Sequence, residues 1–282
     1  MIWIAAAIAV WLVAWGANHW MAYSRFAEHR IVRILAPILF GLSVLALWEG
    51  FVRGLGVSPV IIPAPSAVAA RFMAETGTLW EDFVQTVLKG ALSGYLIGAG
   101  AAFLTAVLID RSAFLTRGLL PIGNFVAALP IVGIAPILVS WFGFDWHSKA
   151  AVVVVMVFFP ILVNTVQGLK EASAMQTDLM RTYAAGYWQT LLKLRLPAAM
   201  PFIFNGLKIA TTLALIGAIV AEYFGSPTRG MGFRISTGVG SLSIDLVWAE
   251  IAVAALTGSV VYGLVAFAEK HVTFWHPSQR HK

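Results

Sequence analysis

The chain has 282 residues, of which 60% are hydrophobic and 11% are charged, and its formal net charge is +6. Soluble domains carry about 25% charged residues, so this composition excludes an ordinary water-soluble protein. The basic residues form no continuous stripe, which argues against nucleic-acid binding, and the absence of cysteine excludes disulfides, thiol catalysis and cysteine-bound metal.

Several apolar blocks are long enough to cross a hydrocarbon layer about 30 Å thick. They are apolar on every side rather than alternating in polarity, which favours transmembrane helices over the strands of a barrel. The sequence therefore predicts an all-α, polytopic membrane protein with about seven transmembrane helices. In chain order the predicted spans are 2–22, 34–52, 88–109, 117–141, 150–168, 199–222 and 246–268.

The first apolar block has no Lys or Arg before it, whereas Arg25, Arg30 and Arg33 follow it. A cleaved signal peptide begins with basic residues, so we interpret this block as a retained helix. With the N-terminus outside, the inner segments hold more Lys and Arg than the outer segments, as is typical of membrane proteins. We therefore expect residues 169–198 and the C-terminal tail to lie in the cytoplasm.

A polar, Pro-rich stretch separates the second and third predicted spans. Within it, Ser66 is a candidate N-cap for a short helix that runs to Thr76, because its hydroxyl can accept the free amide protons of a first turn. This helix is too polar to span the bilayer, and we expect it to lie along the membrane interface.

The inner loop 169–198 is polar but rich in helix-forming residues. Pro197 is expected to open the next membrane helix, where its missing N–H costs nothing. An apolar face outside the membrane needs to be covered, either by the chain's own helices or by a groove on a partner. The apolar residues that recur near helical spacing in this loop are Leu179, Tyr183, Trp188 and Leu191 or Leu192.

The end of this loop carries a resemblance to a known family. The chain resembles the permease subunits of type I ABC importers, within the nitrate, sulfonate, taurine and thiamine-precursor branch. The cytoplasmic signature of that family reads Glu-Ala-Ala, three residues, Gly, nine residues, then Ile-x-Leu-Pro. Counting back from Pro197 places Leu196 and Leu194 on the Leu and Ile, and Ala184 on the Gly. Asp178, Leu179 and Met180 fall on Glu-Ala-Ala, and Gly186 is expected to supply the bend in place of the missing glycine.

The resemblance extends over about residues 34–272. Residues 1–33 are then an additional N-terminal helix with a basic loop, and 273–282 a cytoplasmic tail. Its other features, in order, are Ile62-Pro63-Ala64-Pro65-Ser66, Trp141-Phe142-Gly143, Phe159-Pro160, Gly206-Leu207-Lys208, Ala221-Glu222 and Gly230-Met231-Gly232.

The resemblance implies a multi-pass protein of the bacterial inner (plasma) membrane. Two permease subunits, expected to be a homodimer, would line one pathway through the membrane lipid. Two ATPase subunits would lie beneath them, and a periplasmic or lipid-anchored solute-binding protein would dock outside. The residues expected to couple the permease to the ATPase are Asp178, Leu179, Met180, Arg181, Tyr183, Ala184, Gly186, Leu196 and Pro197.

The chain is not expected to be an enzyme or to hold a cofactor or a metal. A phosphate-binding loop needs Gly-Lys followed by Ser or Thr, and no Lys in this chain follows a Gly. We therefore expect a separate partner subunit to bind and hydrolyse ATP.

Polar residues inside the predicted spans are candidates for the translocation pathway, because such groups are costly in hydrocarbon and usually face a bundle interior. The alternative is that they stabilise helix packing through hydrogen bonds worth about 0.6 kcal/mol each. The pathway candidates are Asn124, Asn164, Lys208, Thr211 and Glu222.

Two other functions are weaker candidates. An ion-coupled secondary transporter would need acidic groups in mid-membrane and inverted repeats. Apart from Glu222 and the boundary residues Asp110 and Glu49, the predicted spans contain almost no acid, and no repeat is evident. An intramembrane enzyme would need a clustered catalytic constellation, and no such pattern is present. The segment 221–226 and the tail 274–278 are most similar to permeases for pyrimidine or thiamine precursors, which favours a small heteroaromatic or anionic nutrient as substrate.

Overall fold

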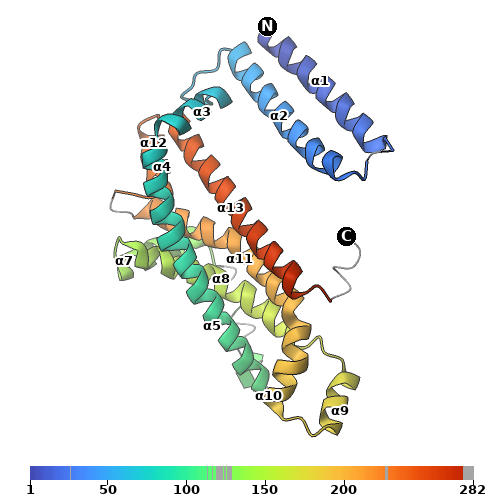
Figure 1. Ribbon diagram of the computed structural model, residues 1–282. Helices are drawn as coiled ribbons and strands as arrows, with labels where there is room; N and C mark the ends of the chain where they lie inside the picture. The colour runs from blue at the N-terminus through green and yellow to red at the C-terminus, as the bar shows by residue number, and fades with distance from the viewer. Residues whose placement is uncertain are drawn as a thin grey trace. The chain divides into compact units, whose positions relative to one another are not determined.

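A computed structural model describes residues 1–25, 27–112, 114–115, 117–118, 123, 125, 129–225 and 228–275, the side chain of Arg30 excepted. Within these residues the regular secondary structure is helical, and there is no strand. The helices are α1 (Ile2–Tyr23), α2 (Arg30–Gly54), α3 (Pro65–Ala74), α4 (Thr76–Phe83), η1 (Val84–Ala91), α5 (Leu92–Arg111), α7 (Ile131–Phe142), α8 (Trp146–Leu169), α9 (Ala174–Thr182), α10 (Tyr187–Thr190), η2 (Leu191–Arg195), α11 (Leu196–Phe224), α12 (Met231–Gly240) and α13 (Ile244–Val272) (Figure 1).

Six helical stretches of the described chain are long and apolar enough to cross a membrane. They confirm the all-α, polytopic prediction and are Ile2–Tyr23, Ile31–Gly54, Thr76–Arg111, Trp146–Leu169, Tyr187–Phe224 and Ile244–Val272. The predicted span 117–141 falls mostly on residues outside the described ranges. Its described end is α7, which has 12 residues and begins directly after Pro130.

Two of the stretches, Thr76–Arg111 and Tyr187–Phe224, begin about three helical turns earlier than predicted, and each contains a π-helical segment, η1 or η2. In η2 the Leu196 N–H bonds the carbonyl oxygen of Leu191, five residues back. Pro197 has no N–H, and in a regular α-helix its ring would collide with the carbonyl four residues earlier. The wider π turn relieves this conflict, so the helix continues through Pro197 and joins α10 to α11.

The chain forms two compact units. The first comprises Met1–Leu79 and Thr237–Ile251. Within it α1 and α2 pack as an antiparallel pair (Figure 1). Gly50 and Gly54 of α2 allow the close approach, because an added Cβ at these positions would overlap Ala7 and Ile4 of α1. Small residues at such contacts let the backbones of membrane helices pack closely.

The expected N-cap at Ser66 is wrong. Helix α3 begins at Pro65, and Ala64 is its N-cap. The Ser66 hydroxyl instead donates to Glu49 Oε1 at 2.7 Å, and its backbone N–H donates to Glu49 Oε2 at 2.9 Å. A carboxylate is a stronger acceptor than a hydroxyl, so Glu49 of α2 takes the free donors of this first turn.

The second unit comprises Trp80–Ser236 and Ala252–Lys282 and has α8 at its centre. Small residues recur at every fourth position from η1 along α5: Gly90, Gly94, Gly98, Ala102 and Ala106. A Cβ at Gly94 would lie 2.5 Å from the Val153 Cβ of α8, so a larger residue would force the two helices apart.

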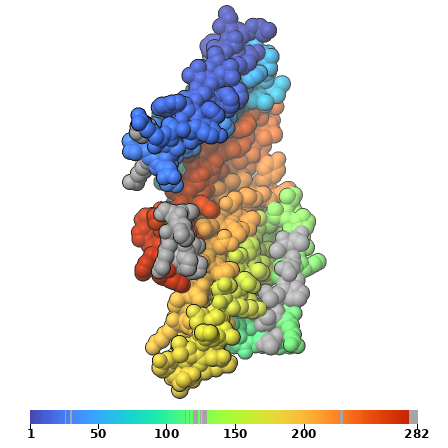
Figure 2. All heavy atoms as spheres, turned by 90° about the vertical axis from the view of Figure 1, so that its right-hand side faces the viewer, coloured from blue at the N-terminus to red at the C-terminus, as the bar shows by residue number. Residues whose placement is uncertain are grey.

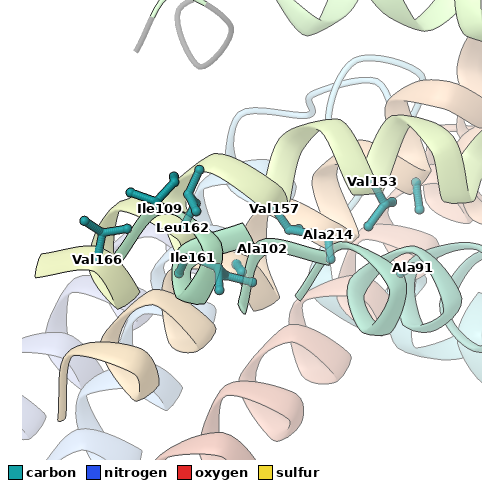
Figure 3. Close-up of a cluster of buried hydrophobic side chains, with 12 residues drawn as sticks. Ala91, Ala102, Ile109, Val153, Val157, Ile161, Leu162, Val166 and Ala214 are labelled. Atoms are coloured by element: carbon teal, nitrogen blue, oxygen red, sulfur yellow. The ribbon is translucent and has the colours of Figure 1, made fainter. Parts of the chain in front are cut away.

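On its other side α8 packs against the alanines of α11. Figure 3 shows Val153, Val157 and Ile161 of α8 beside Ala102 of α5 and Ala214 of α11. Lipid is as apolar as these side chains, so close van der Waals packing rather than exclusion from water holds α5, α8 and α11 together. The ends of these three helices position the two polar regions of the unit, which are the loop 169–198 and the amino end of α12.

Candidate functional site

The loop 169–198 folds into a helical hairpin at one end of the second unit, drawn in yellow in Figure 2. A capping box starts α9: the Gln176 N–H donates to Ser173 Oγ at 3.2 Å, and the Ser173 N–H donates to Gln176 Oε1 at 3.0 Å. This reciprocal pair satisfies two free donors of the first turn and sets where α9 begins.

Helix α9 ends in a left-handed turn at Ala184, whose φ is +54°. The Ala184 N–H bonds the Arg181 carbonyl at 2.8 Å, and the Ala185 N–H bonds the Met180 carbonyl at 3.0 Å. This is the Schellman pattern, in which glycine is usual because a Cβ is strained at positive φ. The expectation that Gly186 supplies the bend is wrong, since its φ of −71° suits any residue. Ala184 itself adopts the conformation for which the signature specifies glycine.

One face of α9 is apolar and exposed. Met175, Leu179 and Tyr183 recur every four residues with exposed fractions of 82%, 56% and 76%. Of the other predicted pair, Leu192 is exposed and Leu191 is buried. A group of large apolar side chains left uncovered by its own unit indicates a surface for a partner.

The polar residues of α9 add little to its stability. Asp178 and Arg181 form an ion pair at 3.1 Å, and both side chains are largely exposed. Exposed pairs of this kind contribute roughly 0.3–0.5 kcal/mol. Both side chains therefore remain accessible to a partner.

The base of the hairpin is clamped to the membrane helices. Arg195 donates to both carboxylate oxygens of Asp110, at 2.6 and 2.7 Å, and its Nε donates to the Leu169 carbonyl at 2.9 Å. The Tyr187 hydroxyl donates to the same carboxylate at 2.9 Å. The clamp, defined as Asp110, Leu169, Tyr187 and Arg195, thus joins the ends of α5 and α8 to the start of α11.

A second polar cluster lies at the amino end of α12. The Gly230, Met231 and Gly232 N–H groups donate, in that order, to Asp82 at 2.6 Å, Thr86 at 2.8 Å and Glu222 at 3.0 Å. Thr86 also donates to Glu222 at 2.7 Å, and Arg234 donates to Asp82 at 2.8 Å. These side chains satisfy the free N–H groups with which any helix begins.

Steric constraints explain why glycine occupies positions 230 and 232. A Cβ at Gly230 would lie 2.5 Å from the Glu222 carboxylate, and one at Gly232 would overlap the Ile219 carbonyl oxygen. Glu222 is 1% exposed, and its Oε1 has no hydrogen-bond partner among the described residues. The Gly-Met-Gly sequence therefore allows α12 to begin directly against a buried carboxylate.

Lys149 lies in the first turn of α8 and is fully buried. Its ammonium donates to the backbone carbonyls of Phe144 and Gly225, and these two carbonyls satisfy the charge inside the unit.

The five pathway candidates do not form one cluster. Asn164 Nδ2 donates to the Pro160 carbonyl at 2.8 Å, while its Oδ1 accepts from Asn205 at 3.0 Å on an exposed face of α8 and α11. Lys208 pairs with Glu269 of α13 at 2.7 Å, and Thr211 donates to the Lys208 carbonyl at 2.7 Å. Glu222 belongs to the cluster at α12, and Asn124 lies outside the described residues.

Sequence reasoning did not select Asp82, Thr86 or Glu269 as site residues, and it noted Asp110 only as an acid at a span boundary. Each of them was detectable as a polar residue within or beside an apolar block. Within the described ranges, no group of three His, Asp or Glu residues is arranged to hold a metal ion.

Residues 86–274 match the family described as "Binding-protein-dependent transport system inner membrane component". The chain is 34% identical to a probable ABC transporter permease protein of Haemophilus influenzae, over 78% of the chain and 89% of that protein. It is 31% identical to the formylaminopyrimidine transport permease ThiX of Halalkalibacterium halodurans, over 89% of the chain and 99% of that protein.

The chain is also 29% identical to the riboflavin transport system permease RibX of Chloroflexus aurantiacus, over 83% of the chain and 88% of that protein. Further relatives are named as permeases for aliphatic sulfonates, taurine and nitrate. The relatives are transport permeases rather than enzymes. With six candidate spans in its described part, this chain is a multi-pass membrane protein and belongs to the family of inner-membrane components of binding-protein-dependent ABC transporters.

Proposed function

We propose that this permease couples to its ATPase through α9 and imports a small heteroaromatic nutrient that a solute-binding protein delivers. The observation that carries the proposal is the exposed face Met175, Leu179 and Tyr183, held on a hairpin whose base is clamped to the ends of α5 and α8. ATP is bound and hydrolysed in a separate subunit.

The clamp suits α9 to transmit force. An amphipathic helix seated in a groove of the ATPase moves with that groove. Arg195, at the base of the hairpin, binds Asp110 through two hydrogen bonds. A displacement of the hairpin that carries α9 is therefore transmitted to α5 and α11 rather than absorbed by a flexible loop. A pathway with inward-open and outward-open states can be switched by such a rigid element.

This mechanism requires α9 in the cytoplasm, and the C-terminus, two spans later, then lies inside as well. With the predicted span 117–141 counted as a crossing, five spans precede α9 and the N-terminus lies outside, in agreement with the distribution of basic residues.

The pathway lies between two copies of the permease. Asn164 and Asn205 form an amide pair on an exposed face of the second unit, and hydrocarbon is a poor solvent for such a pair. A second copy that faces this pair across a water-filled path would solvate it. We propose that Asn164, Lys208 and Thr211 contribute to this path together with Asn124, and that Glu222 acts at its outer end.

The substrate is proposed to be a pyrimidine-type heteroaromatic compound rather than a sulfonate- or nitrate-like anion. Two of the relatives are named for heteroaromatic compounds, formylaminopyrimidine and riboflavin. In addition, Glu269 offsets the charge of Lys208 at 2.7 Å, so this lysine supplies little uncompensated positive charge to attract an anion.

Uptake into proteoliposomes tests the proposal. The permease, its ATPase and its solute-binding protein are reconstituted, and the entry of labelled formylaminopyrimidine and labelled taurine is measured with and without ATP. ATP-dependent entry of the pyrimidine is expected. Entry of taurine alone would reject the substrate assignment, and entry driven by an ion gradient without the ATPase would favour a secondary transporter.

A further inference from the structure

The α9–α10 hairpin borders an open cavity of about 460 Å³. Its lining includes three basic side chains and three hydroxyl-bearing side chains but no carboxylate. These residues are Lys170, Arg181 and Arg195, and Thr177, Tyr187 and Thr190. Guanidinium, ammonium and hydroxyl groups are the usual donors to a phosphate group. The chemistry of the lining therefore favours an oxyanion.

The three basic groups differ in how many of their donors are already hydrogen-bonded within the chain. Arg195 is engaged with Asp110 and with the Leu169 carbonyl, and it thereby covers the partly negative carboxyl end of α8. Arg181 pairs through one nitrogen with Asp178, which does not line the cavity. Lys170 and the remaining donors of Arg181 are therefore the groups with capacity to bind a ligand.

The cavity lies where membrane-spanning helices end. One span finishes at Leu169 and another starts at Tyr187, and both residues line the cavity. Trp188 and Leu192 are exposed beside it, and such side chains are typical of the membrane–water boundary. Basic pockets at this depth can bind the head groups of anionic lipids.

The cavity and the exposed apolar face lie on opposite sides of α9. Thr177 and Arg181 are two residues after Met175 and Leu179, and two residues correspond to a rotation of about 200° in an α-helix. An ATPase seated on Met175, Leu179 and Tyr183 would therefore leave the cavity accessible.

We propose that this cavity is a binding site for a phosphate group, presented either by the head group of an anionic membrane lipid or by inorganic phosphate. The site shares Arg181 with the coupling residues and Arg195 with the clamp, but phosphate binding can be measured on the permease without its ATPase and does not require transport.

Binding is measured by native mass spectrometry of the full-length permease in detergent. Three ligands are titrated separately: short-chain phosphatidylglycerol, the zwitterionic short-chain phosphatidylcholine, and inorganic phosphate. The double substitution Lys170→Gln with Arg181→Gln is compared with Lys193→Gln, which removes an exposed basic residue of η2 that does not line the cavity. Lys170→Arg serves as the conservative variant.

Phosphatidylglycerol is expected to bind at least tenfold more tightly than phosphatidylcholine. The double variant should lose at least tenfold in affinity, while Lys193→Gln and Lys170→Arg should remain within twofold of the native chain. Binding of phosphatidylglycerol without inorganic phosphate assigns the site to a lipid, and the reverse assigns it to the soluble ion.

Equal binding by the native chain and the double variant would overturn the proposal, as would an equal loss in Lys193→Gln. Size-exclusion chromatography of each variant confirms that any loss does not reflect unfolding.

Discussion

Removing the carboxylate of the clamp is the sharpest test of how the hairpin is held. Asp110 is 8% exposed and Arg195 is 21% exposed, and two hydrogen bonds of 2.6 and 2.7 Å join them. Hydrogen bonds to charged groups contribute about 1.5–3 kcal/mol each, and partial exposure of the arginine favours the lower value. Asp110→Ala should therefore lower the free energy of unfolding by about 3 kcal/mol.

A double-mutant cycle isolates the pair from other effects. Asp110→Ala, Arg195→Gln and the double variant are unfolded by titration with sodium dodecyl sulfate, followed by tryptophan fluorescence. The coupling energy is expected to be about 2 kcal/mol, within the range for residues in direct contact. Asp178→Ala is the control, since it removes an ion pair of exposed residues and should cost less than about 0.5 kcal/mol.

The same variant tests the coupling mechanism. In proteoliposomes with the ATPase and the binding protein, Asp110→Ala should reduce the amount of substrate taken up per ATP hydrolysed, because α9 then moves without pulling α5. A coupling energy near zero, or a native ratio of uptake to hydrolysis, would refute this account of the clamp.

Three further substitutions test separate features. Leu179→Asp should prevent co-purification of the ATPase and abolish uptake, whereas Leu179→Met should preserve both; retention of the ATPase by the Asp variant would contradict a docking role for α9. Ala184→Gly should stabilise the end of α9 by about 1 kcal/mol because it relieves the left-handed strain, so hydrogen exchange in the hairpin should slow; faster exchange would exclude the Schellman turn. Gly232→Ala should lower the melting temperature by several degrees because its Cβ overlaps a carbonyl of α11, whereas Gly240→Ala in the same helix has open space and should be neutral; equal effects would argue against the tight start of α12.

Two rules for helix ends gave wrong predictions for this chain. The capping rule assigned Ser66 to its own helix, but Glu49 competes from 17 residues away and is the stronger acceptor. The glycine rule moved the bend to Gly186, but the hydrogen bonds of α9 place the left-handed residue at Ala184, two positions earlier. The first error reflects a partner that is distant in the sequence. The second reflects residue preference, because alanine is strained at the positive φ that Ala184 adopts.

The sequence by itself determined that the chain is helical and membrane-spanning, because hydrocarbon requires every backbone group to be bonded within its own segment. It also determined the position of the hairpin and its apolar face, because both follow from helical spacing. Only the tertiary structure decided which charges are paired. Arg195 meets Asp110 across 85 positions and Arg234 meets Asp82 across 152, and no local pattern encodes contacts between helices that are so far apart in the sequence.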